Sequence, residues 1–197
     1  MGVRASHTAE VLLEDVRLPA DCLLGGDERL EQRLARARAR QGARSAVALT
    51  TFEATRPVVG SQALGVARAA FEFALAYAKE RQQFGRPIIE NQAIAFKLAD
   101  MATEIEATRA LIWRSLWQGR CGGGFKRGEG SMSKLKAGEM AVKVTDDAIQ
   151  ICGGYGYCRD MPVEKWHRDA KIYTIFEGTS EIQRLVIARS ISGVHIP

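Results

Sequence analysis

The chain has 197 residues, 46% of them hydrophobic, which is enough to bury the core of one ordinary domain. Its formal net charge is +5, and residues 27–44 hold six arginines against three acidic residues. No aromatic residue is interleaved with these arginines, so the segment lacks the stacking platform typical of single-strand nucleic-acid binding. We read it as a solvated helix face and expect no nucleic-acid partner.

The cysteine and histidine content indicates neither a zinc site nor a disulfide framework. There are four cysteines without C-x-x-C spacing and three histidines without a pair at metal spacing. We expect no bound metal and buried free thiols in a reducing compartment. No apolar run reaches the roughly 18 residues that span a bilayer, and the first residues do not resemble a signal peptide. We therefore expect a cytoplasmic protein without a membrane span.

The first predicted element is a strand. Residues 8–18 are rich in β-branched and aliphatic side chains, and Pro19 and then Gly25 and Gly26 end the run in a turn. A single strand cannot satisfy its own backbone hydrogen bonds. It must pair with another chain segment or remain a detached edge.

After the strand the pattern becomes helical. The arginine- and alanine-rich stretch at residues 28–42 favours a helix. Three later stretches repeat apolar residues at helical spacing: residues 58–80, 90–118 and 131–151. Pro57 fits a first helical turn, or a kink in a longer helix. Gly153 and Gly154 fit a C-cap, and a last helix is expected over about residues 179–190. We predict an all-α four-helix bundle with a short extended N-terminal segment.

Three motifs narrow the interpretation further. The first is ERQQFGRPI at residues 80–88, followed by Asn91 and Gln92. The second is DAIQICGGYGY at residues 147–157, and the third is RDAKIY at 168–173 running into FEGTSEIQR at 176–184. Their order and spacing resemble the C-terminal helical domain of the acyl-CoA dehydrogenase family.

The resemblance implies a division of the chain. Residues 1–26 are similar to the end of the family's middle β-domain, 27–50 are an arginine-rich linker or insertion, and 51–197 are the helical bundle domain. The family's N-terminal helical domain and most of its β-domain have no counterpart in this sequence.

The resemblance implies that Glu177 is the base that removes the α-proton of an acyl-CoA thioester. Burial of a carboxylate makes it a stronger base, and Phe176 is an apolar neighbour. Without the motif, Glu177 would be interpreted as an acidic residue near the start of a helix, where the helix dipole favours a negative charge. Some family members carry the base at the position of Thr55, and a threonine cannot act as one, which favours Glu177.

The resemblance also implies substrate and cofactor contacts. Gly178 would let the substrate approach the backbone. Glu53 and Arg56 match residues that contact the CoA part, although they would equally fit a surface ion pair. Residues that match FAD contacts are Arg81, Gln83, Phe84, Asn91, Gln92, Gln150, Gly153, Gly154, Thr179 and Glu181. In the family the stretch that matches Gln150 to Gly154 comes from a neighbouring subunit.

The function that the resemblance implies is oxidation of acyl-CoA to trans-2-enoyl-CoA, with hydride transfer to FAD and an electron-transfer flavoprotein as acceptor. We expect a homo-oligomer, or a complex with a chain that supplies the missing half. Two alternatives stay open: a non-catalytic helix-bundle interaction subunit, and a related acyl-CoA oxidase-type flavoenzyme. Neither the acyl chain length nor the role of the arginine-rich segment follows from the sequence.

Overall fold

The computed structural model describes residues 1–23, 26–39 and 46–196. Two compact units can be distinguished: Ala5–Thr50, and Met1–Arg4 together with Thr51–Pro197. The second unit contains the helical bundle and every residue that the sequence assigned to a site. We describe the two units separately.

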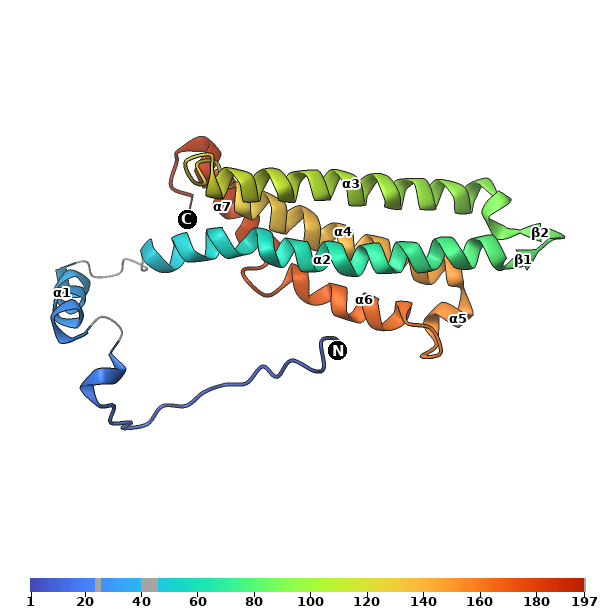
Figure 1. Cartoon of the computed structure of the whole chain (residues 1–197). Helices are drawn as coiled ribbons and strands as arrows, with labels where there is room; N and C mark the ends of the chain where they lie inside the picture. Colours follow the sequence, from blue (N-terminus) through green and yellow to red (C-terminus); the bar gives the residue numbers. More distant parts are fainter. Residues whose placement is uncertain (24–25, 40–45, 197) are drawn as a thin grey trace. The chain divides into compact units, whose positions relative to one another are not determined.

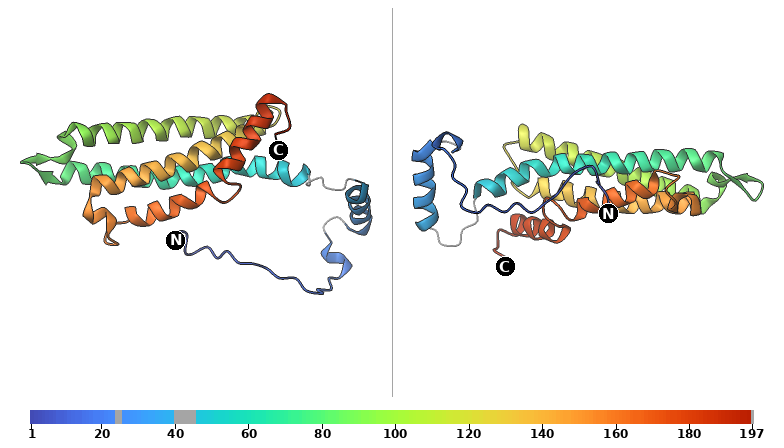
Figure 2. Two further views of the ribbon diagram at one scale, coloured as in Figure 1. Left: turned by 180° about the vertical axis from the view of Figure 1, so that it is seen from behind. Right: turned by 90° about the horizontal axis from the view of Figure 1, so that it is seen from below.

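The bundle is built on three long helices that run side by side (Figure 1). They are α2 (Ala46–Glu80), α3 (Gln92–Arg120) and α4 (Glu129–Cys152). Two shorter helices pack against α4: α6 (Val163–Lys171) lies along it, and α7 (Ser180–Ser192) crosses its other end (Figure 2). This arrangement confirms the predicted all-α bundle, with two short helices at the C-terminal end where one was expected.

The inner face of α2 is made of alanines. Five of them are fully buried at helical spacing: Ala63, Ala67, Ala70, Ala74 and Ala78. Their small side chains let α2 approach its neighbours closely. At Gly60 an added Cβ atom would lie 3.5 Å from the Cβ atom of Ala137 on α4 and 3.6 Å from Ile112 on α3. The core between α2, α3 and α4 is therefore thin and tightly packed.

Pro57 lies inside α2 rather than at its start, because the helix begins 11 residues earlier. A proline has no N–H to donate to the carbonyl group four residues before it, here that of Glu53. This carbonyl packs against α4 instead: a Cβ atom added at Gly130 would lie 2.2 Å from the Glu53 oxygen. Glycine at position 130 therefore makes the contact between the two backbones possible.

A short β-hairpin joins α2 to α3 and was not predicted. Strand β1 (Gln82–Gln83) pairs antiparallel with β2 (Arg86–Pro87). The two turn residues, Phe84 and Gly85, have φ angles of 58° and 76°. Two successive residues with positive φ are typical of a type I′ hairpin turn. The 3-10 helix η2 (Ile88–Glu90) then leads into α3.

The predicted C-cap of α4 is confirmed, and α7 has a side-chain N-cap at Thr179. Gly153 ends α4 with a φ of 64°, and the hydroxyl oxygen of Thr179 accepts a hydrogen bond from the backbone N–H of Ile182. Between these helices lie α5 (Gly154–Tyr157) and η3 (Ile172–Thr174), which the sequence pattern did not indicate. They are too short to show a periodic apolar pattern.

The predicted strand at residues 8–18 is wrong. The structure has no strand in this stretch, and its large apolar side chains, Val11, Leu12, Leu13, Val16 and Leu18, are exposed. A strand needs a partner for its backbone, and none pairs with this stretch in the described part of the chain. It is followed by η1 (Ala20–Cys22) and by α1 (Gly26–Ala39). The latter confirms the helix expected from residue 28, while residues 40–42 of that prediction lie outside the described residues.

One part of α2, Thr51–Glu80, is long and apolar enough to cross a membrane, judged by length and composition only. No such segment was expected from the sequence. A core helix of a bundle passes the same test, and the buried alanine face of α2 belongs to the bundle core.

The close contacts of α4 make a testable prediction at Gly138. A Cβ atom there would lie 2.6 Å from the backbone oxygen of Tyr173, which cannot move away without shifting η3. We expect Gly138→Ala to lower the free energy of unfolding by about 1–3 kcal/mol. Gly65 lies inside α2 with no atom within 4 Å of an added Cβ. Gly65→Ala should therefore raise stability by about 0.5–1 kcal/mol. Chemical denaturation measures both, and equal effects would contradict the close approach at Gly138.

Candidate functional site

The residues that the sequence assigned to a site form two groups at opposite ends of α4. One group surrounds residues 175–179, which we call the base loop, and Lys134 near the start of α4 contacts it. The other surrounds the β-hairpin and the end of α4 at Cys152. With 18 residues between Lys134 and Cys152 and a rise of 1.5 Å each, the two ends are about 27 Å apart.

The base loop has an unusual backbone. Glu177 and Gly178 both have positive φ, 56° and 89°. This conformation costs a non-glycine residue about 1–3 kcal/mol and persists only where the surroundings impose it. Here Gln183 of α7 donates its side-chain N–H to the carbonyl oxygens of Glu177 and Gly178 at 3.1 and 2.9 Å. Lys134 Nζ donates to the same Gly178 oxygen at 2.6 Å.

The Glu177 carboxylate is half-buried and touches α2. The single hydroxyl proton of Thr55 has two acceptors, Glu177 Oε2 at 3.3 Å and the backbone oxygen of Phe52 at 3.2 Å. Phe176 packs edge-on against the buried ring of Tyr173, with ring centroids 5.4 Å apart. Phe176 is still 37% exposed, so the apolar surroundings expected of the base are only partly supplied by this chain. The carboxylate thus lies against a hydroxyl group of α2 and remains accessible.

Glu53 and Arg56, expected to contact CoA or to form a surface ion pair, lie inside the bundle. Arg56 NH1 bonds to Glu53 Oε2 at 2.5 Å and to Ser131 Oγ at 2.7 Å, and Arg56 is only 5% exposed. Ser131 donates its backbone N–H and its hydroxyl to the Glu53 carboxylate. This network joins α2 to the start of α4, so the surface-pair reading is wrong. Arg56 also lies near the base loop, 3.8 Å from the Cβ position of Gly178.

Lys134 is a residue that the sequence reading missed. Its side chain is among the largest that are fully buried, and burial lowers its pKa from the usual 10.5 to about 8. The nearby Arg56 cation acts in the same direction, whereas the carboxylates of Glu177 and Glu181 act against it. A signal was available: Lys134 stands four residues from both Gly130 and Gly138, on the helix face that takes these close contacts.

The second group of predicted residues surrounds an open pocket of about 590 Å³, which we call the hairpin pocket. Its lining residues are Tyr77, Arg81, Gln83, Ile88, Ile151, Cys152, Gly153, Gly154, Tyr155, Cys158 and Asp160. Four predicted FAD contacts, Arg81, Gln83, Gly153 and Gly154, therefore meet in one pocket of one chain. The sequence reading had assigned the glycines to a neighbouring subunit.

The hairpin pocket has the chemistry that a dinucleotide requires. The Arg81 guanidinium lies over the ring of Tyr155, 5.9 Å from its centroid, which orients a cation suited to phosphate. No atom lies within 4 Å of a Cβ position at Gly153 or Gly154, so a ligand can approach their backbone. The aromatic ring, the cation and the open backbone fit the pyrophosphate and adenosine portion of FAD.

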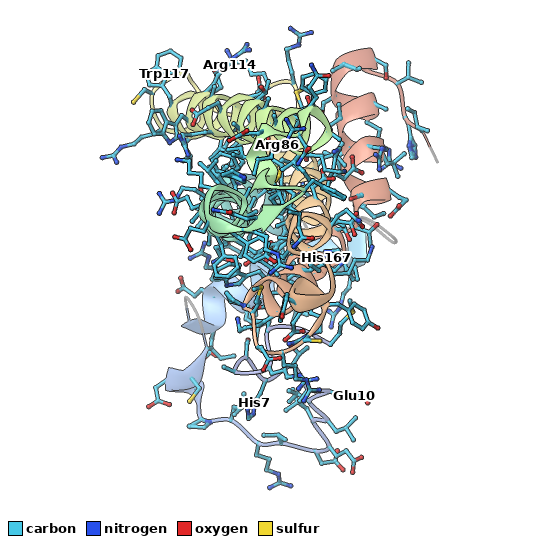
Figure 3. The ribbon with its side chains drawn as sticks, turned by 90° about the vertical axis from the view of Figure 1, so that its right-hand side faces the viewer. His7, Glu10, Arg86, Arg114, Trp117 and His167 are labelled. Carbon is cyan, nitrogen blue, oxygen red and sulfur yellow. The ribbon has the colours of Figure 1, made fainter. Side chains whose placement is uncertain are left out.

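The remaining predicted cofactor residues divide between the two ends. At the hairpin, Phe84 is 94% exposed at the turn, and Asn91 accepts a hydrogen bond from Arg86 at 2.9 Å. Figure 3 shows Arg86 at the near end of the bundle, viewed from the hairpin side. Gln92, at the start of α3, and Gln150, near the end of α4, are also exposed.

At the other end, Thr179 and Glu181 lie in the first turn of α7. The Glu181 backbone N–H and the Thr179 hydroxyl lower the pKa of the Glu181 carboxyl group. A negative charge is favoured at the N-terminal end of a helix. Glu181 therefore stays ionised beside the base loop.

The four cysteines are free, but only Cys152 is buried, so the expectation of buried thiols is wrong for the other three. Burial raises the pKa of Cys152 to about 11, which keeps this thiol protonated and unreactive. In the described part of the chain, no three His, Cys, Asp or Glu side chains gather to hold a metal ion.

The low pKa of Lys134 predicts a pH-dependent stability. Below pH 8 both the folded and the unfolded chain carry the lysine proton. Between about pH 8 and 10.5 the folded chain loses it first, so the wild type gains stability as the pH rises. Lys134→Met removes this titration. Between pH 8 and 10.5 we expect the free energy of unfolding of the wild type to rise by about 3 kcal/mol relative to that of the variant. Denaturation at pH 7, 8.5 and 10 tests this, and a difference that does not change with pH would contradict it.

Comparison with known proteins assigns the family. Residues 40–192 match the family model described as acyl-CoA dehydrogenase, C-terminal domain. The probable acyl-CoA dehydrogenase YngJ of Bacillus subtilis is 47% identical over 191 residues, which cover 97% of this chain and 46% of that protein. The chain thus spans less than half the length of this relative.

Solved structures give the same result. Butyryl-CoA dehydrogenase from Megasphaera elsdenii matches with a TM-score of 0.71 and 41% identity, over 74% of this chain and 38% of the other. A chain from a structure of the electron transferring flavoprotein of Acidaminococcus fermentans matches with a TM-score of 0.70 and 44% identity, over 72% and 37%. With its bundle, its base loop and these matches, this chain belongs to the acyl-CoA dehydrogenase family, whose C-terminal helical domain it contains.

Proposed function

We propose that this chain is the helical half of an FAD-dependent acyl-CoA dehydrogenase in which Glu177 removes the α-proton of the acyl-CoA. The observation that carries the proposal is the base loop. Its strained backbone is held by two buried side chains, and its carboxylate lies against the Thr55 hydroxyl. Strain of this kind is concentrated at active sites.

The proton step needs a carboxylate that is fixed in position and free to accept. Glu177 takes the α-proton, its backbone is fixed by Gln183, and the Thr55 hydroxyl lies 3.3 Å from Oε2. Bound FAD supplies the acceptor for the hydride that leaves the β-carbon, so the product is a trans-2-enoyl-CoA. Gly178 lies next to the base, and a side chain there would displace Gln183, whose Nε2 lies 2.6 Å from the Cβ position. Arg56, buried behind the loop, supports it rather than meeting the CoA directly.

The distance between the two groups of site residues favours a site shared between chains. Thr179 and Glu181 lie at one end of α4 and the hairpin pocket at the other, about 27 Å away. We propose that the hairpin pocket of one copy holds the adenosine and pyrophosphate of an FAD whose ring faces the base loop of another copy. The remaining contacts to the ring come from the part of such an enzyme that this chain does not span.

Exposed aromatic side chains support association. On α3 the side chains of Phe96, Trp113 and Trp117 are 62%, 67% and 61% exposed, and Figure 3 shows Trp117 pointing away from the bundle. Large exposed apolar groups of this kind mark contact surfaces. We propose a homo-oligomer or a complex with a second chain, and an electron-transfer flavoprotein as the acceptor. The match to a chain from a structure of such a flavoprotein supports the second point.

The base assignment is tested by Glu177→Gln in the assembled flavoprotein. Glutamine keeps the size and the hydrogen bonding but cannot accept the proton. We expect the rate of flavin reduction by acyl-CoA, measured by stopped-flow absorbance, to fall by about 10²–10⁴-fold. Glu72→Gln is the matched control, since Glu72 is exposed on α2, where it pairs with Arg68; its rate should change little.

Two outcomes would overturn the proposal. Nearly normal reduction by Glu177→Gln would mean that another group takes the proton. Failure of every acyl-CoA to reduce the flavin of the wild-type assembly would favour a non-catalytic interaction subunit.

The hairpin pocket is tested separately through FAD affinity. Arg81→Leu removes the cation that faces the pocket, and a hydrogen bond to a charged group contributes about 1.5–3 kcal/mol. We therefore expect FAD to bind about 10- to 100-fold more weakly, measured by fluorescence quenching on titration. Arg68→Leu is the control, because Arg68 is exposed on α2 and pairs with Glu72. Equal affinity of the two variants would show that FAD does not use this pocket.

A further inference from the structure

Lys134 is a buried cation that protein stability does not explain. Its side chain is 1% exposed, and in the described part of the chain no salt bridge joins it to a carboxylate. Burying an ammonium group without a close counter-ion is unfavourable. Neighbouring positions of α4 are filled by small residues such as Ser133 and Ala137, so a neutral side chain would suit the helix equally well.

The hydrogen bond that Lys134 donates holds the backbone of the base loop. Its ammonium group donates to the carbonyl oxygen of Gly178 at 2.6 Å, the shortest of the three side-chain bonds that hold the base loop. Gln183 donates to the same oxygen from the opposite helix, α7. Two donors on one carbonyl oxygen fix the plane of the peptide group that follows Gly178. The Gln183 bond to the Glu177 carbonyl oxygen fixes the preceding peptide group, and the two peptide groups together hold Glu177 and Gly178 in their left-handed conformation.

The position of Lys134 on α4 agrees with a role in holding the base loop. Gly138, one helical turn further on, takes the backbone of Tyr173 in close contact, and Gly130, one turn earlier, takes that of Glu53. The same face of α4 therefore holds the segment before the base loop, the loop itself and the helix that carries Thr55. Lys134 is the central residue of this face and its only charged member.

We propose that Lys134 is a positioning residue for proton abstraction, whose ammonium group holds the Gly178 carbonyl and so keeps Glu177 left-handed with its carboxylate aimed at the α-proton. The inference rests on the proposed role of Glu177 as the base. Without Lys134, the loop keeps Gln183 but can relax toward the ordinary φ values that a glutamate prefers. The carboxylate then turns away from Thr55.

The first test measures the loop and not the reaction. Lys134→Met keeps the length and the apolar stem of the side chain but removes the donor. In the assembled flavoprotein at pH 7, hydrogen–deuterium exchange with mass spectrometry should show faster exchange in peptides that cover residues 174–184. Lys136→Met is the matched control: Lys136 lies on the same helix, is 40% exposed and pairs with Glu104 of α3. It should leave these peptides unchanged.

The second test measures the reaction. A misplacement of about 1 Å in a catalytic group costs on the order of 10²-fold in rate. We expect Lys134→Met to slow flavin reduction by about this factor while the dissociation constant for acyl-CoA changes little, and Lys136→Met to change neither. Lys134→Gln, a shorter neutral donor, should restore part of the rate. It also serves as the test variant if the methionine variant does not fold.

The outcomes separate this inference from the proposed function. If Glu177→Gln abolishes flavin reduction but Lys134→Met leaves both the rate and the exchange of residues 174–184 at wild-type values, the role of Lys134 is refuted and the base assignment stands. If the exchange increases and the rate does not fall, Lys134 holds the loop but does not serve catalysis, and the proposal is again overturned. If Glu177→Gln is itself active, the proposed function fails, whatever Lys134 does.

Discussion

The structure depends on the direct approach of backbone segments to one face of α4. Gly130 receives the Glu53 carbonyl that Pro57 leaves without a helix partner, and Gly138 receives the carbonyl of Tyr173. Side chains at either glycine would push these segments away. Because α2 carries Thr55 and η3 leads into the base loop, the two contacts set the distance between them. The 3.3 Å bond from Thr55 to Glu177 follows from that spacing.

The long helices could be predicted from the sequence more completely than the candidate site. The long helices of the bundle follow from apolar periodicity, and Gly153 and Thr179 act as caps for local reasons that a sequence displays. The strand at residues 8–18 fails because strand formation depends on a partner, which composition cannot show. The hairpin escapes the pattern because its strands have two residues each, and its turn places Phe84, not a typical turn residue, at positive φ.

The site residues show the same division. Motif resemblance singles out Glu177 and the hairpin-pocket residues as candidates because their types are distinctive. It leaves the surface-pair alternative open for Arg56, since burial is a property of the packed bundle and not of the motif. It misses Lys134 and Gln183 for a related reason: a lysine or glutamine on a helix normally reads as solvent-exposed. Their significance appears only when both side chains are seen to donate to one carbonyl oxygen.

These features together suggest how such a site is maintained. A left-handed glutamate and a buried lysine each destabilise the folded chain when considered alone. In the bundle each offsets part of the other's cost, because the ammonium group finds the carbonyl that the strained backbone presents, and the carboxylates of Glu177 and Glu181 favour its charge. A chain selected for stability alone would be expected to replace both. Their joint presence, where the start of α4 meets the loop before α7, therefore argues that the conformation of Glu177 serves the proposed proton abstraction.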